Sequence, residues 1–138
     1  MVLMQRMNTN QTTQKSELLY PQLSFTIVGV LFDAHNELGP YAREKQYGDS
    51  IEAKFKFAKI PYRRECAIGT STNIADFIIN DLILIELKSK RLLLREDYEQ
   101  TQRYLQAGNL RLGLLVNFRN KYLKPVRVVK IDSPHRNY

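Results

Sequence analysis

Two apolar runs separated by Asn80-Asp81 stand at residues 74–88, with the sequence IADFIINDLILIELK. Apolar runs of this length bounded by turn residues predict β-strands, and Asn-Asp is typical of a tight hairpin turn. The second run is apolar at four successive positions, 82–85, so both of its faces should be covered, as in the centre of an α/β sheet. The chain is therefore expected to fold around a central sheet with helices packed on it.

Three charged side chains interrupt these two apolar runs. Asp76 lies inside the first apolar run, while Glu86 and Lys88 stand at the end of the second. Side chains alternate along a strand, so Glu86 and Lys88 share one face. A buried carboxylate is costly without a partner, so each acid requires a cation, a hydrogen-bond network or a metal ion. The simpler alternative for Glu86 and Lys88 is a salt-bridged pair at a strand end.

The register of the hairpin decides whether Asp76 and Glu86 can meet. A strict two-residue loop at Asn80-Asp81 would pair Asp76 with Ile85 and turn Glu86 to the opposite face. A three-residue loop, or one β-bulge near Asp76, would set Asp76 opposite Glu86. Because bulges are common beside active sites, we predict a register irregularity here. A regular two-residue hairpin would undercut the site.

The remaining elements are predicted from the spacing of apolar residues and from turn residues. The first helix is expected to take Ser24 as its N-cap and to end before Gly39-Pro40. The predicted elements are helices at 24–38, 43–59 and 95–107 and strands at 62–68, 73–79, 82–87, 112–117 and 126–131. This order, α-α-β-β-β-α-β-β, indicates an α/β or α+β sheet with helices packed on it.

Three further polar residues are candidates for the same site. Glu44 stands at the N-terminal end of the apolar stripe of its helix, although the helix dipole alone favours a glutamate in a first turn. Gln100 and Tyr104 are four residues apart and share one helix face, which is also compatible with an ordinary polar surface. Only the neighbouring strands make these residues candidates.

Length and composition favour one domain and exclude several classes of protein. The chain has 138 residues, of which residues 1–16 are polar and are predicted to be a disordered leader, with a single domain at 17–138. The sequence has no run of about 18 apolar residues, so no membrane span is predicted. Its N-terminus has no apolar signal region, so export is not expected. A single cysteine, Cys66, excludes an internal disulfide framework and suits a reducing cytoplasm. Two histidines and one cysteine are too few for a typical structural zinc site.

The chain is basic, with 21 Lys and Arg against 14 Asp and Glu and a net charge of +7. A surplus of this size favours a polyanionic partner such as nucleic acid. The surplus is concentrated in residues 119–138, which carry six Lys or Arg and the single acid Asp132. A solubilising tail is the alternative explanation for that segment.

Taken in order, these residues resemble the PD-(D/E)XK nuclease superfamily. Asp76 takes the first acidic position, Glu86-Leu87-Lys88 matches the E-x-K element, and residues 100–104 resemble the Q-x-x-x-Y motif of the RecB-like and λ-exonuclease-like branches. More narrowly, the chain is similar to the bacterial GxxExxY family of small nuclease-fold proteins. The matching segments are 36–40, 44–47, 76, 86–88, 100–105 and 113–118.

This resemblance implies a restriction-endonuclease-like α/β core, with a mixed central sheet flanked by helices. It also implies a phosphodiesterase that cuts nucleic acid, DNA more than RNA, with Mg²⁺ or Mn²⁺ as cofactor. The implied metal ligands are Glu44, Asp76, Glu86 and the carbonyl of Leu87.

The roles implied for the remaining residues follow from the same resemblance. Lys88 would position water and stabilise the pentavalent phosphate, Gln100 would orient the metal or water shell, and Tyr104 would support the helix face or touch the substrate. Two alternatives stay open: a catalytically silent nuclease-fold module that binds nucleic acid or a protein partner, and a subunit, such as a homodimer, whose surface serves assembly.

Overall fold

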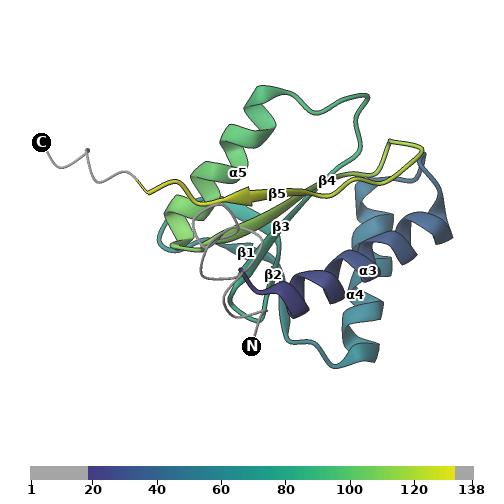
Figure 1. The fold of residues 1–138 in the computed structure, drawn as a ribbon, viewed down its shortest axis with the longest axis horizontal. Coiled ribbons are helices and arrows are strands. Elements are labelled where there is room, and N and C mark those ends of the chain that lie inside the picture. The colour runs from purple at the N-terminus through teal and green to yellow at the C-terminus, as the bar shows by residue number, and fades with distance from the viewer. Residues whose placement is uncertain (1–18, 133–138) are drawn as a thin grey trace, which may run out of the picture.

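A five-stranded mixed sheet with helices on both faces forms the fold (Figure 1). The computed structural model describes residues 19–132; the predicted leader at 1–16 and both ends of the predicted domain at 17–138 lie outside them. The elements are α3 (Pro21–Leu38), α4 (Glu44–Ala58), β1 (Tyr62–Ala67), β2 (Ile74–Ile79), β3 (Ile83–Lys88), α5 (Arg95–Gly108), β4 (Leu112–Asn117) and β5 (Val126–Val129). Their order confirms the predicted one.

The sheet is mixed because a single pair of its strands is parallel. The strands lie in the order β1-β2-β3-β4-β5, and all neighbours are antiparallel except β3 and β4. A parallel pair needs a crossover connection, which α5 supplies. Residues 83–87 of β3 are buried, as the apolar run at 82–85 predicted for that strand, and every residue of β4 is buried as well.

Two apolar layers hold the helices on the sheet. On one face α3 and α4 pack against Phe77, Ile85 and Val116. On the other face α5 packs against Ala75 and Leu84 through a smaller cluster. The sheet is thus covered on both faces, with its charged hairpin residues close to the strand ends.

The close approach of α5 to the sheet depends on Gly113 in β4. A Cβ atom at this position would lie 3.1 Å from Cγ2 of Thr101 and 3.4 Å from Cδ2 of Leu105. The absent side chain therefore lets the helix that carries Gln100 and Tyr104 sit tightly over the sheet.

Most predicted boundaries lie within one residue of those in the structure, and two differ by more. The first helix begins at Pro21 rather than at a Ser24 N-cap, because proline at N1 already has the helical φ, and the Ser24 hydroxyl donates to the Pro21 carbonyl at 3.3 Å. The last strand ends at Val129 rather than at residue 131, because the Ile131 N–H donates to the side chain of Gln102 instead. No helix within residues 19–132 is long and apolar enough to cross a membrane.

Candidate active site

The β2–β3 hairpin has a three-residue loop. Ile79 pairs with Ile83, which leaves residues 80–82 in the turn, and Asn80 and Asp81 both adopt left-handed φ angles, 53° and 56°. Asn and Asp tolerate this conformation better than most residues. Extending the pairing past Phe77 and Ile85 sets residue 76 opposite residue 86, so the predicted register irregularity is confirmed.

A second irregularity lies at Asp76 itself. The pairing of β1 with β2 omits Glu65 and Asp76, and Glu65 has a left-handed φ of 49°. Phe77 packs on the α3–α4 side of the sheet, whereas Ala75 packs on the α5 side. Residues two apart normally share a face, so β2 changes face at Asp76. A left-handed non-glycine residue inside a strand is strained, and such strain clusters at functional sites.

Reciprocal side chain–backbone hydrogen bonds replace the sheet ladder where the two acids meet. The Asp76 N–H donates to Oε1 of Glu86 at 3.1 Å, and the Leu87 N–H donates to Oδ2 of Asp76 at 2.7 Å. Glu86 is only 4% exposed. The two carboxylates are thereby fixed side by side at the point where β2 and β3 separate.

Burial and proximity make this pair of acids electrostatically unfavourable. Burial, reinforced by the neighbouring Asp76 charge, raises the pKa of Glu86 to about 8. Burial also raises the pKa of Asp76, against the hydrogen bond from Leu87, and the charge of Glu44 adds to the effect. Two adjacent carboxylates cannot both be charged at low cost without a nearby cation.

Lys88 is held from α5 rather than by Glu86. Its Nζ donates to Oε1 of Gln100 at 2.8 Å and lies 3.9 Å from Asp97, and Nε2 of Gln100 donates to the Tyr104 hydroxyl at 3.1 Å. In the described part of the chain no ion pair joins Glu86 to Lys88, so a simple salt-bridged pair does not explain them. Gln100 donates a hydrogen bond to the buried Tyr104, so these two residues are not simply part of an exposed polar helix surface.

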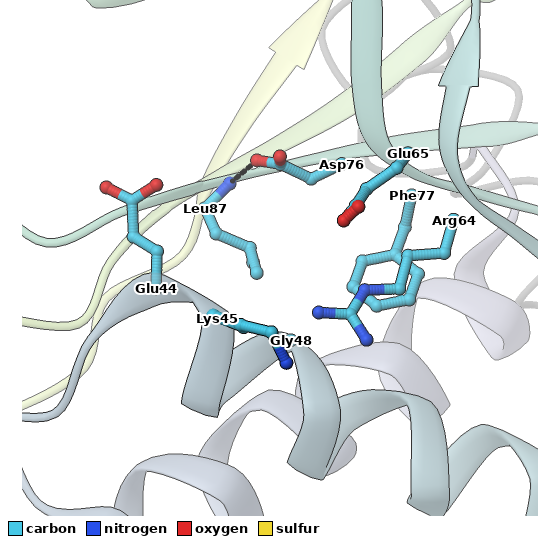
Figure 2. Close-up of a pocket in the computed structure, with 8 residues that line it drawn as sticks. All are labelled: Glu44, Lys45, Gly48, Arg64, Glu65, Asp76, Phe77 and Leu87. Atoms are coloured by element: carbon cyan, nitrogen blue, oxygen red, sulfur yellow. Dashed lines mark hydrogen bonds between the residues drawn. The ribbon is translucent and has the colours of Figure 1, made fainter.

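A cavity of about 240 Å³ opens beside the acids, between α4 and the sheet (Figure 2). Figure 2 shows Glu44 on the helix side of this cavity and Asp76 with Glu65 on the sheet side. Glu44 is exposed, at the first residue of α4, and shares the cavity with Leu87. It therefore faces the same cavity as Asp76 without being fixed to it.

The donor set fits a hard divalent cation. Asp76, Leu87 and Glu44 line the cavity, whereas Glu86 does not line it and accepts a hydrogen bond from the Asp76 N–H. A cation would relieve the repulsion between the Asp76 and Glu86 carboxylates, and the Leu87 carbonyl and the Glu44 carboxylate are further oxygen donors. Within residues 19–132 no three acidic, histidine or cysteine side chains are gathered closely enough to form a metal site by themselves. A metal would therefore be held by the carboxylates of Asp76 and Glu86 and by the Leu87 carbonyl. Glu44 is exposed and could add a further carboxylate ligand.

Two buried polar residues that the sequence did not single out support the strand end. Asp97 is bonded by Nζ of Lys90 at 2.9 Å and by the Leu94 N–H at 2.8 Å, and these contacts, against the effect of burial, lower its pKa. Asn117 accepts from the Lys90 N–H and donates to the Lys90 carbonyl. An acid at the third position of a predicted helix was the available sign for Asp97.

Comparison with known proteins gives one family and one solved structure. A family model described as the PD-(D/E)XK nuclease superfamily matches residues 21–129. The structure titled "Crystal structure of SSO0001" is similar at 23% identity and a TM-score of 0.47, over 86% of this chain and 61% of that one. The chain thus spans less than two thirds of that protein. No curated protein matches.

Proposed function

The chain belongs to the PD-(D/E)XK nuclease superfamily, and on that premise we propose that it is a divalent-metal-dependent phosphodiesterase acting on nucleic acid. The observation that carries the proposal is the reciprocal bonding of Asp76 and Glu86, which holds a half-buried and a buried acid together at a strand end. Proteins rarely bury such a pair for stability alone, because the charged forms repel each other.

The residues proposed to hold the metal are Asp76, Glu86, the Leu87 carbonyl and Glu44. When bound there, Mg²⁺ or Mn²⁺ would supply an activated water and neutralise charge on the phosphate. The hydrogen bonds around Asp76 and Glu86 orient their carboxylates before any ligand arrives, so little ordering is left for the binding step.

Lys88 is proposed to stabilise the negative charge that builds on the phosphate. It shares the β3 face of Glu86, and Gln100 fixes its amine from α5, with Tyr104 holding Gln100 in turn. A preorganised cation next to the reacting phosphate stabilises the pentavalent state without further reorganisation. Gln100 and Tyr104 are thus proposed to position Lys88. Gln100 is also proposed to orient the metal ion or its water.

The test is cleavage of mixed DNA and RNA substrates with and without Mn²⁺. Wild type should cut only with the metal, and Glu86→Gln and Lys88→Met should each lose at least about 100-fold in rate. Asp33→Asn, an exposed acid on α3, is the matched control and should cut like wild type. Nucleic-acid binding that persists without cleavage in every condition would favour the silent binding module instead.

The narrower expectations are also proposals. Within the superfamily we propose that the chain belongs to the bacterial GxxExxY group. This proposal is supported by segments 36–40 and 44–47, together with Asp76, Glu86 and Lys88. DNA ahead of RNA is the proposed substrate, and the basic surplus supports a polyanion. A cytoplasmic location is also proposed, because a single cysteine suits a reducing compartment.

A homodimer or a complex with a partner protein is a further proposal, which a measurement of molecular mass in solution tests.

A further inference from the structure

Two strongly exposed tyrosines each carry a cation over the ring. Tyr41 is 81% exposed with the Arg119 guanidinium 5.5 Å from its ring centroid, and Tyr122 is 73% exposed with Nζ of Lys121 at 5.4 Å. We call these four residues the tyrosine platform. Large aromatic rings left in water beside cations are typical of surfaces that bind nucleic-acid bases and phosphates.

The platform stands on a rigid base. Phe118, just before the loop between β4 and β5, is fully buried and stacks on Tyr47 with ring centroids 4.2 Å apart. The loop carbonyl of Asn120 is bonded to Nε2 of His35 at 2.8 Å, and Leu123 anchors the far end in the core. Tyr122 is thus presented by an anchored loop, and Tyr41 lies in the α3–α4 connection, where the Ala42 N–H donates to the Tyr47 hydroxyl at 3.2 Å. Little ordering of either segment is needed on binding.

Two hydrogen bonds join neighbours of the platform residues to the end of β3. The Phe118 N–H donates to the carbonyl of Lys88 at 2.8 Å, and the Ser89 hydroxyl donates to the carbonyl of Ala42 at 3.4 Å. Ala42, which accepts the hydrogen bond from Ser89 just after β3, is the neighbour of Tyr41 in the sequence, and Tyr41 stands three positions before Glu44.

The charge around the platform suits a phosphate backbone. Arg119, Lys121 and Lys124 lie in this loop, and the sequence has no acid between residues 118 and 131. The two cations close to the rings could contact phosphates on either side of a stacked base. Exposed aromatic rings alone would not select a polyanion. Rings combined with cations that have no acid near them in the sequence do favour one.

We propose that the tyrosine platform binds single-stranded nucleic acid, with bases stacked on Tyr41 and Tyr122 and phosphates against Arg119 and Lys121. Base faces are available for stacking only where the strand is unpaired, since in an intact duplex each base is covered by its neighbours. This inference rests on the proposed function and narrows it: the substrate is a single strand, or the unpaired part of a duplex.

The test is fluorescence anisotropy of a labelled oligothymidylate of about 12 nucleotides, titrated with metal-free protein so that cutting plays no part. A backbone of equal length without bases measures the phosphate contribution, and an oligouridylate distinguishes RNA from DNA. Tyr41→Ala and Tyr122→Ala should each weaken oligothymidylate binding about 5- to 100-fold while leaving the base-free backbone unchanged. Tyr41→Phe should bind like wild type, because stacking needs only the ring.

Phe57→Ala is the matched control, since Phe57 is 91% exposed at the other end of α4. Equal binding of oligothymidylate and base-free backbone by wild type, tighter binding of duplex than of single strand, or unchanged binding by both alanine variants would each overturn the inference. Mn²⁺-dependent cleavage by wild type, measured separately, would in that case leave the proposed function intact. Base-dependent binding that needs Tyr41, without any cleavage, would overturn the proposed function and keep this inference.

Discussion

At the scale of single residues, the buried Glu86 carboxylate makes stability depend on pH in metal-free protein. Its pKa is raised from 4.5 to about 8, so between these values the folded state binds a proton that the unfolded state does not. The free energy of unfolding therefore falls as pH rises through this window. Glu86→Gln, which cannot ionise, should flatten this fall and should be more stable than wild type above pH 8.

Urea denaturation in the presence of a chelator, repeated across the pH range, measures this effect. Asp33→Asn is again the control, because Asp33 is exposed and its loss should leave the pH profile unchanged. A Glu86→Gln variant whose stability follows the wild-type pH profile would contradict the account of the buried pair.

The acids of the site could be predicted from the sequence because each breaks a local pattern. Asp76 and Glu86 interrupt apolar strands, and their meeting needed only the register of one hairpin. Glu65 gave no such sign, since an exposed glutamate in a strand is ordinary and its left-handed φ follows from tertiary geometry. Gln100 was a candidate for the same site, but its hydrogen bond to Lys88 could not be predicted, because it depends on how α5 crosses the sheet.

At the scale of elements, the tight packing of α5 on β4 should be sensitive to Gly113. Gly113→Ala places a methyl group 3.1 Å from Cγ2 of Thr101, so the Thr101 side chain or the helix that carries it must move by a few tenths of an ångström, at a cost of about 1–3 kcal/mol. The same shift would move Gln100 relative to Lys88 and reduce any cleavage activity. Thermal and urea denaturation measure the first effect.

Gly29→Ala in α3 provides the contrast, since no atom lies within 4 Å of a Cβ added there. This change should stabilise the protein by about 0.5–1 kcal/mol, because alanine is the better helix former. Equal effects of the two substitutions would show that close packing of α5 is not what Gly113 provides.

The order of elements could be predicted from periodicity, but their ends depend on competing partners. Whether the hairpin loop has two or three residues could not be decided locally, because Asn80 and Asp81 suit either turn. The structure adds Leu82 to the loop, and this addition brings the acids together. Likewise, the side chain of Gln102 ends β5 earlier than its apolar pattern indicated.

At the scale of the whole molecule, the net charge of +7 predicts salt-dependent binding of nucleic acid. The logarithm of the association constant should fall linearly with the logarithm of salt concentration. Arg119→Gln should reduce the slope by about 0.7 for a single strand, because one phosphate contact is lost. Lys56→Gln, an exposed lysine near the end of α4, should leave the slope unchanged.

Anisotropy titrations at several salt concentrations measure these slopes. If the Arg119 and Lys56 variants change the slope equally, the positive charge acts as a diffuse surplus and the platform has no special role. A slope near zero for wild type would contradict nucleic acid as the partner altogether.

The central claim is that Asp76 and Glu86, at the point where β2 and β3 separate, hold a divalent metal that cleavage requires. Calorimetric titration of Mn²⁺ into wild type and Glu86→Gln, with cleavage measured on the same samples, tests it most directly. The account predicts that wild type binds Mn²⁺ and cuts nucleic acid, and that Glu86→Gln loses both together. Cleavage by Glu86→Gln at the wild-type rate, or no binding of Mn²⁺ by either protein, would contradict it.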